Sequence, residues 1–386
     1  MKETDKSFDD IRPLLDSEVP NAIEQLINDK SFRKAVEPIF KPLTWDQVAA
    51  LLSQCKTKNE FQGKVISPVM EIIIEKTTTE TTGLNWERIP ENESNIFISN
   101  HRDIVLDAAL FNILLFKRNI TTTEIAIGDN LLIYPWIENL VRLNKSFIVK
   151  RGVSVRQMLQ VSKHLSEYIN KTITERQQSV WLAHREGRAK DSNDKTQVSL
   201  IKMLTLYDNA NPLQALKNIN IIPLSISYEY DPCDYLKAKE FQLKRDNPQH
   251  KKSQSDDIEN MYTGITGFKG KVHFKLGNSI NPLLDKIPEK TIRKEVLNKV
   301  AKIIDKEIYL NYSFFPVNYI AYDMMSGEDK FKSEYSEQDI ENFNKYLDTQ
   351  IEKIEIPNKD NEYLRNKIIL MYGNTVKNYL SAAQRL

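Results

Sequence analysis

The sequence predicts an α/β fold with a largely parallel sheet, flanked by helical regions at both ends of the chain. In the middle of the chain, short runs rich in β-branched and aromatic residues alternate with helical stretches, which is typical of parallel sheets. Towards both ends, apolar residues recur at helical spacing without strands between them. We therefore expect an N-terminal helical bundle (1–84), an α/β domain (85–285) and a C-terminal helical region (286–386).

The N-terminal region is expected to be helical from about Phe8 to Thr79. Apolar residues recur there every three or four positions, and Thr44 precedes one such run as a helix cap does. The region offers no catalytic residue of its own. After Pro282 the helical pattern returns, and the expected helices there are 292–310, 337–354 and 363–380.

The central region is expected to contain six short strands with helices between several of them. The expected strands are 96–99, 124–127, 146–149, 180–183, 219–230 and 271–276, and the expected helices are 103–116, 153–173 and 197–207. In such sheets functional residues gather where strands end and helices begin. The lysine-rich segment 231–262 is expected to be a mobile, solvated insertion within this domain.

The composition excludes several classes of protein. A net charge of +1 gives no basic excess for a nucleic-acid partner. Two cysteines, Cys55 and Cys233, cannot build a disulfide framework and have no zinc-ligand spacing, which favours a reducing cytoplasm. The polar N-terminus lacks the core of a signal peptide, and no apolar run is long enough to span a bilayer. Any membrane contact is therefore expected from the surface.

A histidine, His101, follows the first strand of this domain in the run SNHRDIVLD (99–107). Histidine is well suited to move protons near neutral pH, and a carboxylate beside it fixes its tautomer. Asp107 and Asp103 are both candidates for that carboxylate. A serine hydrolase is excluded because no G-x-S-x-G occurs, and a kinase loop is excluded because position 108 is Ala. Alone, the motif fits equally well a surface loop in which Asp103 caps the next helix.

Three further polar clusters follow at later strand ends. The second ends a strand with Lys150 and Arg151, and the third is HREGRAK (184–190), which includes Arg188. Arginine and lysine bind phosphate or carboxylate groups, so these cations could face one anion. The fourth is a strand that contains Pro223, and proline there indicates an edge, a bulge or a wall beside a binding cleft.

Together the four clusters resemble the motifs of the glycerolipid acyltransferase superfamily, over roughly residues 85–285. The order is N-H-x4-D, then G…F-x-x-R, then E-G-x-R, then a strand with proline. The chain departs from the pattern in three places. In the first motif, five residues instead of four separate His101 from Asp107. In the second, the residue three positions after Phe147 is Lys150, and Arg151 comes one position later. In the third, Arg188 lies two positions after Glu186, where the pattern has three.

The first departure matters most, because one extra residue turns a regular helix by about 100°. A bulge or a later helix start is needed for Asp107 to reach His101, and Asp103 is the rival partner.

The resemblance implies a role for each matching residue. His101 acts as general base and Asp107 orients it, without metal or cofactor. The matching residues of the other motifs would contact the substrates. Arg151 or Lys150, together with Arg188, would hold the acceptor, and Pro223 would shape the acyl-side wall. Within the third motif, Glu186 would be the acidic residue, and Gly187 would give the backbone room.

The resemblance also implies an O-acyltransferase of phospholipid biosynthesis. The donor would be the thioester of acyl-CoA or of acyl carrier protein, and the first candidate acceptor is 1-acyl-sn-glycerol-3-phosphate. Glycerol 3-phosphate, an amino-acid lipid, and a non-catalytic lipid-binding role are the alternatives. The protein would be cytoplasmic and peripheral to the inner face of the membrane. It could dock through the N-terminal helices, the 231–262 segment or the aromatic segment 309–322.

Overall fold

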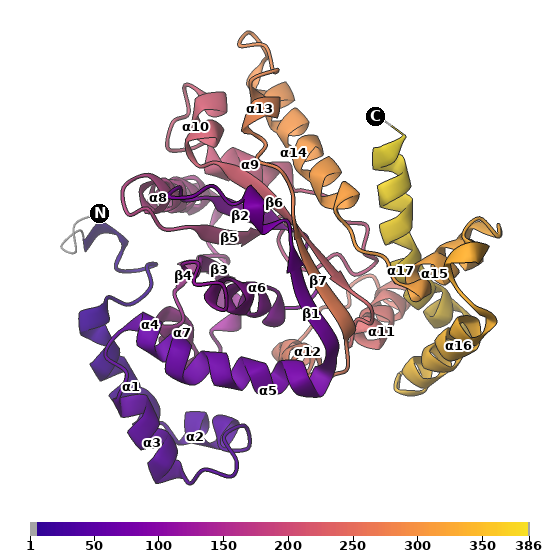
Figure 1. Cartoon of the computed structure of the whole chain (residues 1–386), viewed down its shortest axis with the longest axis horizontal. Coiled ribbons are helices and arrows are strands. Elements are labelled where there is room, and N and C mark those ends of the chain that lie inside the picture. Colours follow the sequence, from indigo (N-terminus) through magenta and orange to yellow (C-terminus); the bar gives the residue numbers. More distant parts are fainter. Residues whose placement is uncertain (1–5, 385–386) are drawn as a thin grey trace.

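The computed structural model describes residues 6–384 and places a seven-stranded sheet at the centre of the molecule (Figure 1). The strand order is β1-β7-β6-β2-β5-β3-β4, and all neighbouring pairs are parallel except β6 with β7. The predicted α/β class with a largely parallel sheet is therefore confirmed. The strands are β1 (Thr78–Leu84), β2 (Ile96–Ser99), β3 (Glu124–Gly128), β4 (Ser146–Val149), β5 (Val180–Ala183), β6 (Ile221–Tyr228) and β7 (Gly270–Leu276).

Strand β1 is the part of the sheet that the sequence did not reveal. Its residues close the region expected to be a helical bundle, yet they pair in parallel with β7 at the edge of the sheet. Only Gly83 of this strand is buried, so its sequence TTETTGL carries no apolar alternation. The polar composition suits an edge strand, and it also explains why the strand was missed.

Helices cover both faces of the sheet. Successive residues of β2 point to opposite faces, so Ile96 and Ile98 pack on one side with α8 and α14, and Phe97 packs on the other with α6. The helices between and after the strands are α6 (Leu106–Phe116), α7 (Pro135–Leu143), α8 (Val155–Thr174), α9 (Val198–Leu204), α10 (Pro212–Asn218), α13 (Asn281–Leu284) and α14 (Arg293–Leu310).

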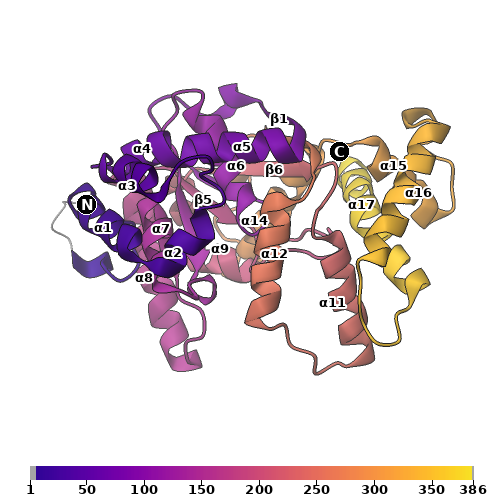
Figure 2. The same ribbon diagram turned by 90° about the horizontal axis from the view of Figure 1, so that it is seen from below.

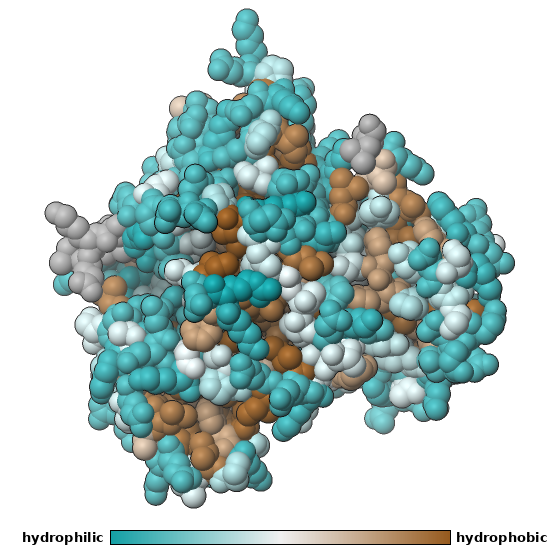
Figure 3. Space-filling model, viewed as in Figure 1, coloured by the Kyte–Doolittle hydropathy of each residue, from teal (hydrophilic) through white to brown (hydrophobic). Residues whose placement is uncertain are grey.

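The N-terminal helices form a small core of their own beside the sheet (Figure 1). That core also includes Leu143 at the end of α7, which ties it to the central domain. The helices of this core are α1 (Val19–Asn28), α2 (Lys30–Val36), α3 (Trp45–Ser53) and α4 (Lys58–Phe61). The next helix, α5 (Ser67–Thr77), packs instead on the sheet with α6 through Met70. Figure 3 shows hydrophobic side chains gathered over the N-terminal helices and again near α17.

The expectation of a solvated insertion at 231–262 was wrong. The segment contains two helices, α11 (Asp234–Asp246) and α12 (Gln254–Thr266), which project together from the domain (Figure 2). Leu236 and Ala238 are buried, and Lys237 is only 3% exposed. Three charged residues of α11, Asp234, Lys237 and Glu240, are buried. Lys237 meets partners outside the helix, forming an ion pair with Asp231 and donating to the carbonyl of Arg102.

The C-terminal helices pack against α11 and form a third hydrophobic core, in which Ala238 takes part. They are α15 (Pro316–Ser326), α16 (Glu337–Glu352) and α17 (Asn361–Ala383). The buried carboxylate of Asp234 accepts hydrogen bonds from Tyr346 and Tyr372, which joins these helices to the central domain. Within the aromatic segment 309–322, Tyr312 and Phe315 are buried, so they offer no exposed docking surface. No helix in the described part of the chain has the length and apolar character to cross a bilayer.

Candidate active site

His101 and Asp107 lie in contact at the carboxyl end of β2. His101 follows the strand by two residues, and Asp107 lies in the first turn of α6. Nδ1 of His101 is 2.8 Å from Oδ2 of Asp107. The contact is possible because α6 begins at Leu106, three residues later than the sequence predicted. The late start offsets the extra residue between the two side chains.

Asp103 is the reason for the late helix start. Its Oδ1 accepts hydrogen bonds from the backbone N–H groups of Val105 and Leu106, at 2.9 and 2.7 Å, as a capping residue does. Burial, together with the nearby charge of Asp107, raises the pKa of Asp103. Asp103 therefore positions the helix, and it is not the partner of His101.

The carboxylate of Asp107 is held by three donors. Its Oδ2 accepts from the backbone N–H groups of Arg102, at 2.6 Å, and Asp103, at 3.1 Å, as well as from His101. The side chain is 1% exposed, so water does not compete for these bonds. This geometry holds the carboxylate in one orientation and directs the Nδ1–H of His101 at it.

Nε2 of His101 is the atom left for chemistry. With the proton on Nδ1, Nε2 carries the lone pair that a general base needs. No hydrogen bond within residues 6–384 engages this atom. The imidazole lies edge-on to Trp181, with 6.0 Å between ring centroids, and 13% of the side chain is exposed. The pair can therefore accept a proton from a small molecule that reaches the edge of the sheet.

Asn100 fixes the backbone that carries His101. Its side-chain amide donates to the carbonyl of Ile226, and its Oδ1 accepts from the N–H of the same residue, both at 2.8 Å. On the other side, the backbone N–H of His184 donates to the carbonyl of Ser99 at 2.7 Å. These bonds continue the pairing of β2 with β5 and β6 past the ends of the strands, so the position of His101 is set by the sheet.

The second and third clusters meet at the carboxyl end of the sheet, as His101 and Asp107 do. Nη1 of Arg151 is 3.3 Å from Oε1 of Glu186, and Arg151 is about one-third exposed. A β-carbon at Gly128 would lie 2.7 Å from Nε of Arg151, so glycine there leaves room for the arginine. Gly187 has φ +65°, a backbone conformation that glycine adopts without strain. Lys150 forms an ion pair with Asp10 instead. Of the two candidate cations, Arg151 is the one that joins the clusters.

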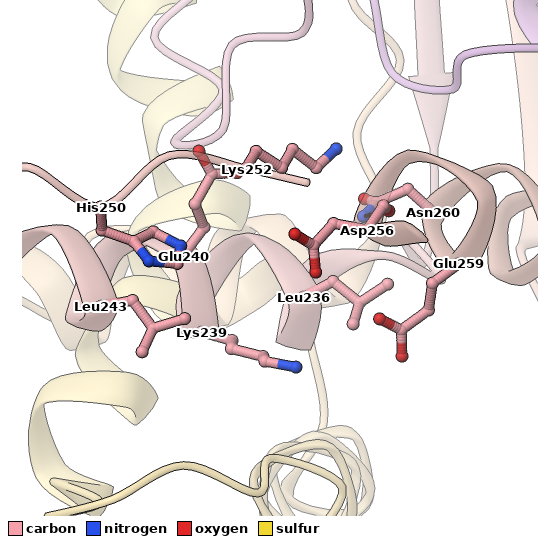
Figure 4. A pocket seen from close by; sticks show the side chains of 9 residues that line it. All are labelled: Leu236, Lys239, Glu240, Leu243, His250, Lys252, Asp256, Glu259 and Asn260. Atoms are coloured by element: carbon pink, nitrogen blue, oxygen red, sulfur yellow. Dashed lines mark hydrogen bonds between the residues drawn. The ribbon is translucent and has the colours of Figure 1, made fainter. Parts of the chain in front are cut away.

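Arg188 is directed towards α12. Its Nη2 donates to Oδ1 of Asn260 at 2.7 Å, and its Nη1 is buried without a partner among the described residues. Asn260 also lines a pocket between α11 and α12 (Figure 4). Arg188 thus links the third cluster to α12, which lies in the segment 231–262 that we expected to be an insertion.

Pro223 lies inside the sheet and not at an edge. Strand β6 has β2 on one side and β7 on the other, so the edge interpretation was wrong. The carbonyl of Pro223 accepts from the N–H of Gly277 at 2.7 Å and therefore faces β7. The missing N–H of proline points to the same side, where the pairing with β7 only begins at Leu224. The strand tolerates proline there because no pairing bond is lost.

Comparison with known proteins agrees with this geometry. Residues 82–227 match the acyltransferase family. These residues form an acyltransferase domain. The resemblance inferred from the four motifs is thereby confirmed at the level of the family, and the matched range includes the motif residues from His101 to Pro223.

Other comparisons add little. Among solved structures, the 1-acyl-sn-glycerophosphate (LPA) acyltransferase PlsC from Thermotoga maritima is similar to this chain. The two share 14% sequence identity with a TM-score of 0.36, and 78% of this chain and 100% of that chain are covered. No protein with a curated description matches the sequence.

Beside the dyad, the acyltransferase domain contains a buried ion pair that sequence reasoning missed. Nη2 of Arg102 is 2.6 Å from Oδ2 of Asp194, and the hydroxyl of Tyr312 donates to the same oxygen at 2.7 Å. Arg102 is 6% exposed and Asp194 is fully buried. The pair fixes the residue whose backbone N–H holds Asp107. No local signal marks Asp194, because its partners are 92 and 118 positions away.

A histidine beside this buried ion pair is expected to make the stability of the acyltransferase domain depend on pH. His184 is fully buried, 3.9 Å from Asp194, and burial lowers its pKa from 6.5 to about 4. As the pH falls through this window, the unfolded chain takes up a proton that the folded protein refuses. The free energy of unfolding is therefore expected to decrease, by up to about 3 kcal/mol through this group.

Urea unfolding at successive pH values measures this effect. His184→Asn removes the group, so its unfolding free energy should decrease less than that of the wild type between pH 6.5 and 4. His250→Gln, in the loop between α11 and α12, is the matched control and should keep the wild-type slope. Equal slopes for wild type and His184→Asn would contradict the prediction.

Proposed function

We propose that this chain transfers a fatty acyl group from an acyl thioester to a glycerolipid hydroxyl. The donor is acyl-CoA or acyl carrier protein, and the first candidate acceptor is 1-acyl-sn-glycerol-3-phosphate. One observation carries the proposal: within an acyltransferase domain, His101 is held by a buried carboxylate and keeps Nε2 free.

The chemistry requires only one proton carrier. Nε2 of His101 takes the proton of the acceptor hydroxyl while that oxygen attacks the thioester carbonyl. The tetrahedral intermediate then expels the thiolate, which takes the proton back from Nε2 as the ester forms. Asp107 stabilises the positive charge that the imidazole carries between these two steps. The donor carbonyl is already activated, so the proposal assigns no metal or cofactor to the reaction.

The position of Arg151 supports a phosphorylated acceptor. It lies at the carboxyl edge of the sheet, as His101 does, and is about one-third exposed. A guanidinium can bind phosphate through two parallel hydrogen bonds, and the dianion would compete with Glu186 for it. A lipid acceptor would be met at a membrane surface, and a cytoplasmic location at the inner face remains a prediction.

A thioester-release assay with a panel of acceptors tests the proposal. Purified protein is given acyl-CoA, or acyl carrier protein loaded with a fatty acyl thioester, together with glycerol 3-phosphate, lysophosphatidate or a lyso-amino-acid lipid. We expect acceptor-dependent thiol release that is fastest with lysophosphatidate. Faster release with another acceptor would reassign the substrate. No release with any pair would favour a non-catalytic lipid-binding role.

Replacing Arg151 with alanine is expected to raise KM for a phosphorylated acceptor by about 10- to 100-fold, because a charge-assisted hydrogen bond is lost. The KM for a lyso-amino-acid lipid should change little. Lys150→Ala is the matched control, since Lys150 pairs with Asp10 and should leave both values near those of the wild type. Steady-state kinetics measure these constants. An unaltered KM for the phosphorylated acceptor would count against phosphate binding by Arg151.

A further inference from the structure

The amino-terminal end of α8 stands free of the rest of the protein. Every residue from 154 to 160 is exposed, which for two turns of helix means that no side is covered. Burial begins only at Leu165, where the helix packs on the sheet. In Figure 2, α8 extends away from the body of the molecule, on the side where α11 and α12 also project. We call residues 154–160 the α8 tip.

The α8 tip is apolar on one side. Val155 is 86% exposed, Met158 53% and Leu159 64%. Residues three and four apart share one side of a helix, so these three side chains form a continuous apolar surface. Leaving three large apolar side chains in water is unfavourable, and the fold buries none of them.

The sequence of the α8 tip and its flanks contains cations but no acidic residue. Residues 150–163 contain Lys150, Arg151, Arg156 and Lys163, and no aspartate or glutamate. Lys150, Arg151 and Lys163 each pair with a carboxylate outside this run, from Asp10, Glu186 and Glu167. Arg156, on the tip itself, forms no ion pair within the described residues 6–384. An apolar surface with an unpaired arginine beside it is complementary to a bilayer that carries anionic lipids.

The α8 tip also lies at the same end of the sheet as the candidate active site. Strand β4 ends at Val149, Arg151 follows, and α8 begins at Val155. Because β4 is parallel to β3 and β3 to β5, this end of the strand lies at the same edge of the sheet as His184 and the His101 loop. A surface bound to the α8 tip would therefore face the edge at which the proposed reaction occurs.

We propose that the α8 tip inserts into the interface of an anionic lipid bilayer and holds the site against it. The size of the tip favours lipid over a protein partner. Seven helical residues span about 10 Å, whereas a stable protein interface covers about 800 Å² on each side. A convex end with three apolar side chains suits insertion between headgroups. That the bound membrane faces an active site rests on the proposed function. Binding of the α8 tip to a bilayer does not require acyl transfer.

Vesicle flotation without substrates tests the proposal. Wild-type protein should float with vesicles of phosphatidylcholine mixed with phosphatidylglycerol. The triple variant Val155→Ser, Met158→Ser, Leu159→Ser should bind them at least about 10-fold more weakly, since its apolar surface is lost. Ile292→Ser is the matched control: Ile292 is 63% exposed, precedes α14 and should leave binding unchanged. Arg156→Gln should weaken binding to anionic vesicles only.

Several outcomes would overturn the proposal. One is equal binding by wild type and triple variant, and another is no binding by the wild type. A third is a raised KM of the triple variant for acyl carrier protein with unchanged vesicle binding, which would make the α8 tip a protein contact. Turnover of a dispersed short-chain lysophosphatidate separates the two hypotheses. If the proposed function fails, neither protein turns this acceptor over, while the difference in vesicle binding persists.

Discussion

Replacing His101 with alanine is expected to lower kcat for acyl transfer by at least about 100-fold. General base catalysis contributes about 10²- to 10⁴-fold in enzymes. Nε2 of His101 is the atom at this edge that is left free to supply it, because Nδ1 is occupied by Asp107 at 2.8 Å. Thioester release with the best acceptor of the panel measures the loss.

The partner of His101 provides the second half of this test. Asp107→Asn keeps the shape of the side chain, and its carbonyl can still accept from the backbone N–H groups of Arg102 and Asp103. The amide does not hold the Nδ1–H tautomer or stabilise an imidazolium, so kcat should fall by a similar factor. The urea concentration at which half of the Asp107→Asn protein is unfolded should stay close to that of the wild type.

A distant histidine is the matched control. His164 lies on α8, where its Nε2 donates a hydrogen bond to Oδ1 of Asp10 at 3.1 Å, and it has no contact with the dyad. His164→Ala should therefore retain activity within a few-fold of the wild type. If His101→Ala were equally active, His101 would not be the base, and the lipid-binding alternative would gain support.

The parts of the fold that could be predicted are those whose burial is uniform. Strands β2, β4 and β5 begin and end at the predicted residues, since each contains a run of three or four apolar residues between polar neighbours. The edge strand β1 could not be predicted, because only Gly83 in it is buried and its partner in the described sheet, β7, lies about 190 residues further along the chain. Apolar patterning reports burial, and an edge strand has little of it.

The candidate site was predicted in part for a similar reason. The position of His101 follows from the end of an apolar strand. Its contact with Asp107 depends on where α6 starts, and Val105 and Leu106 are apolar whichever start is chosen. The start is decided by the hydrogen bonds of Asp103, which depend on three-dimensional geometry. The burial of Asp234 in α11 could not be foreseen, because its partners Tyr346 and Tyr372 lie more than 100 positions away.

Removing Asp194 should have the largest effect on stability. Asp194→Ala leaves the guanidinium of Arg102 buried at 6% exposure without its 2.6 Å partner, and it also removes the acceptor of Tyr312. Breaking one side of a buried ion pair costs about 3–5 kcal/mol, because the remaining charge keeps its desolvation penalty. We expect a decrease of that size in the free energy of unfolding, measured by urea titration at neutral pH.

A double variant separates the charge from the packing. If the loss arises from an uncompensated charge, Arg102→Met combined with Asp194→Leu should recover much of it, because neither site then holds a charge. The exposed pair Lys217–Asp285 is the matched control within the same domain, with Asp285 65% exposed. Asp285→Ala should cost about 1 kcal/mol or less. An equal loss from Asp194→Ala and Asp285→Ala would show that the pair does not anchor the loop of His101. An effect confined to Asp194 would mean that the fold around the His101 loop depends on a buried charge outside the His101–Asp107 pair.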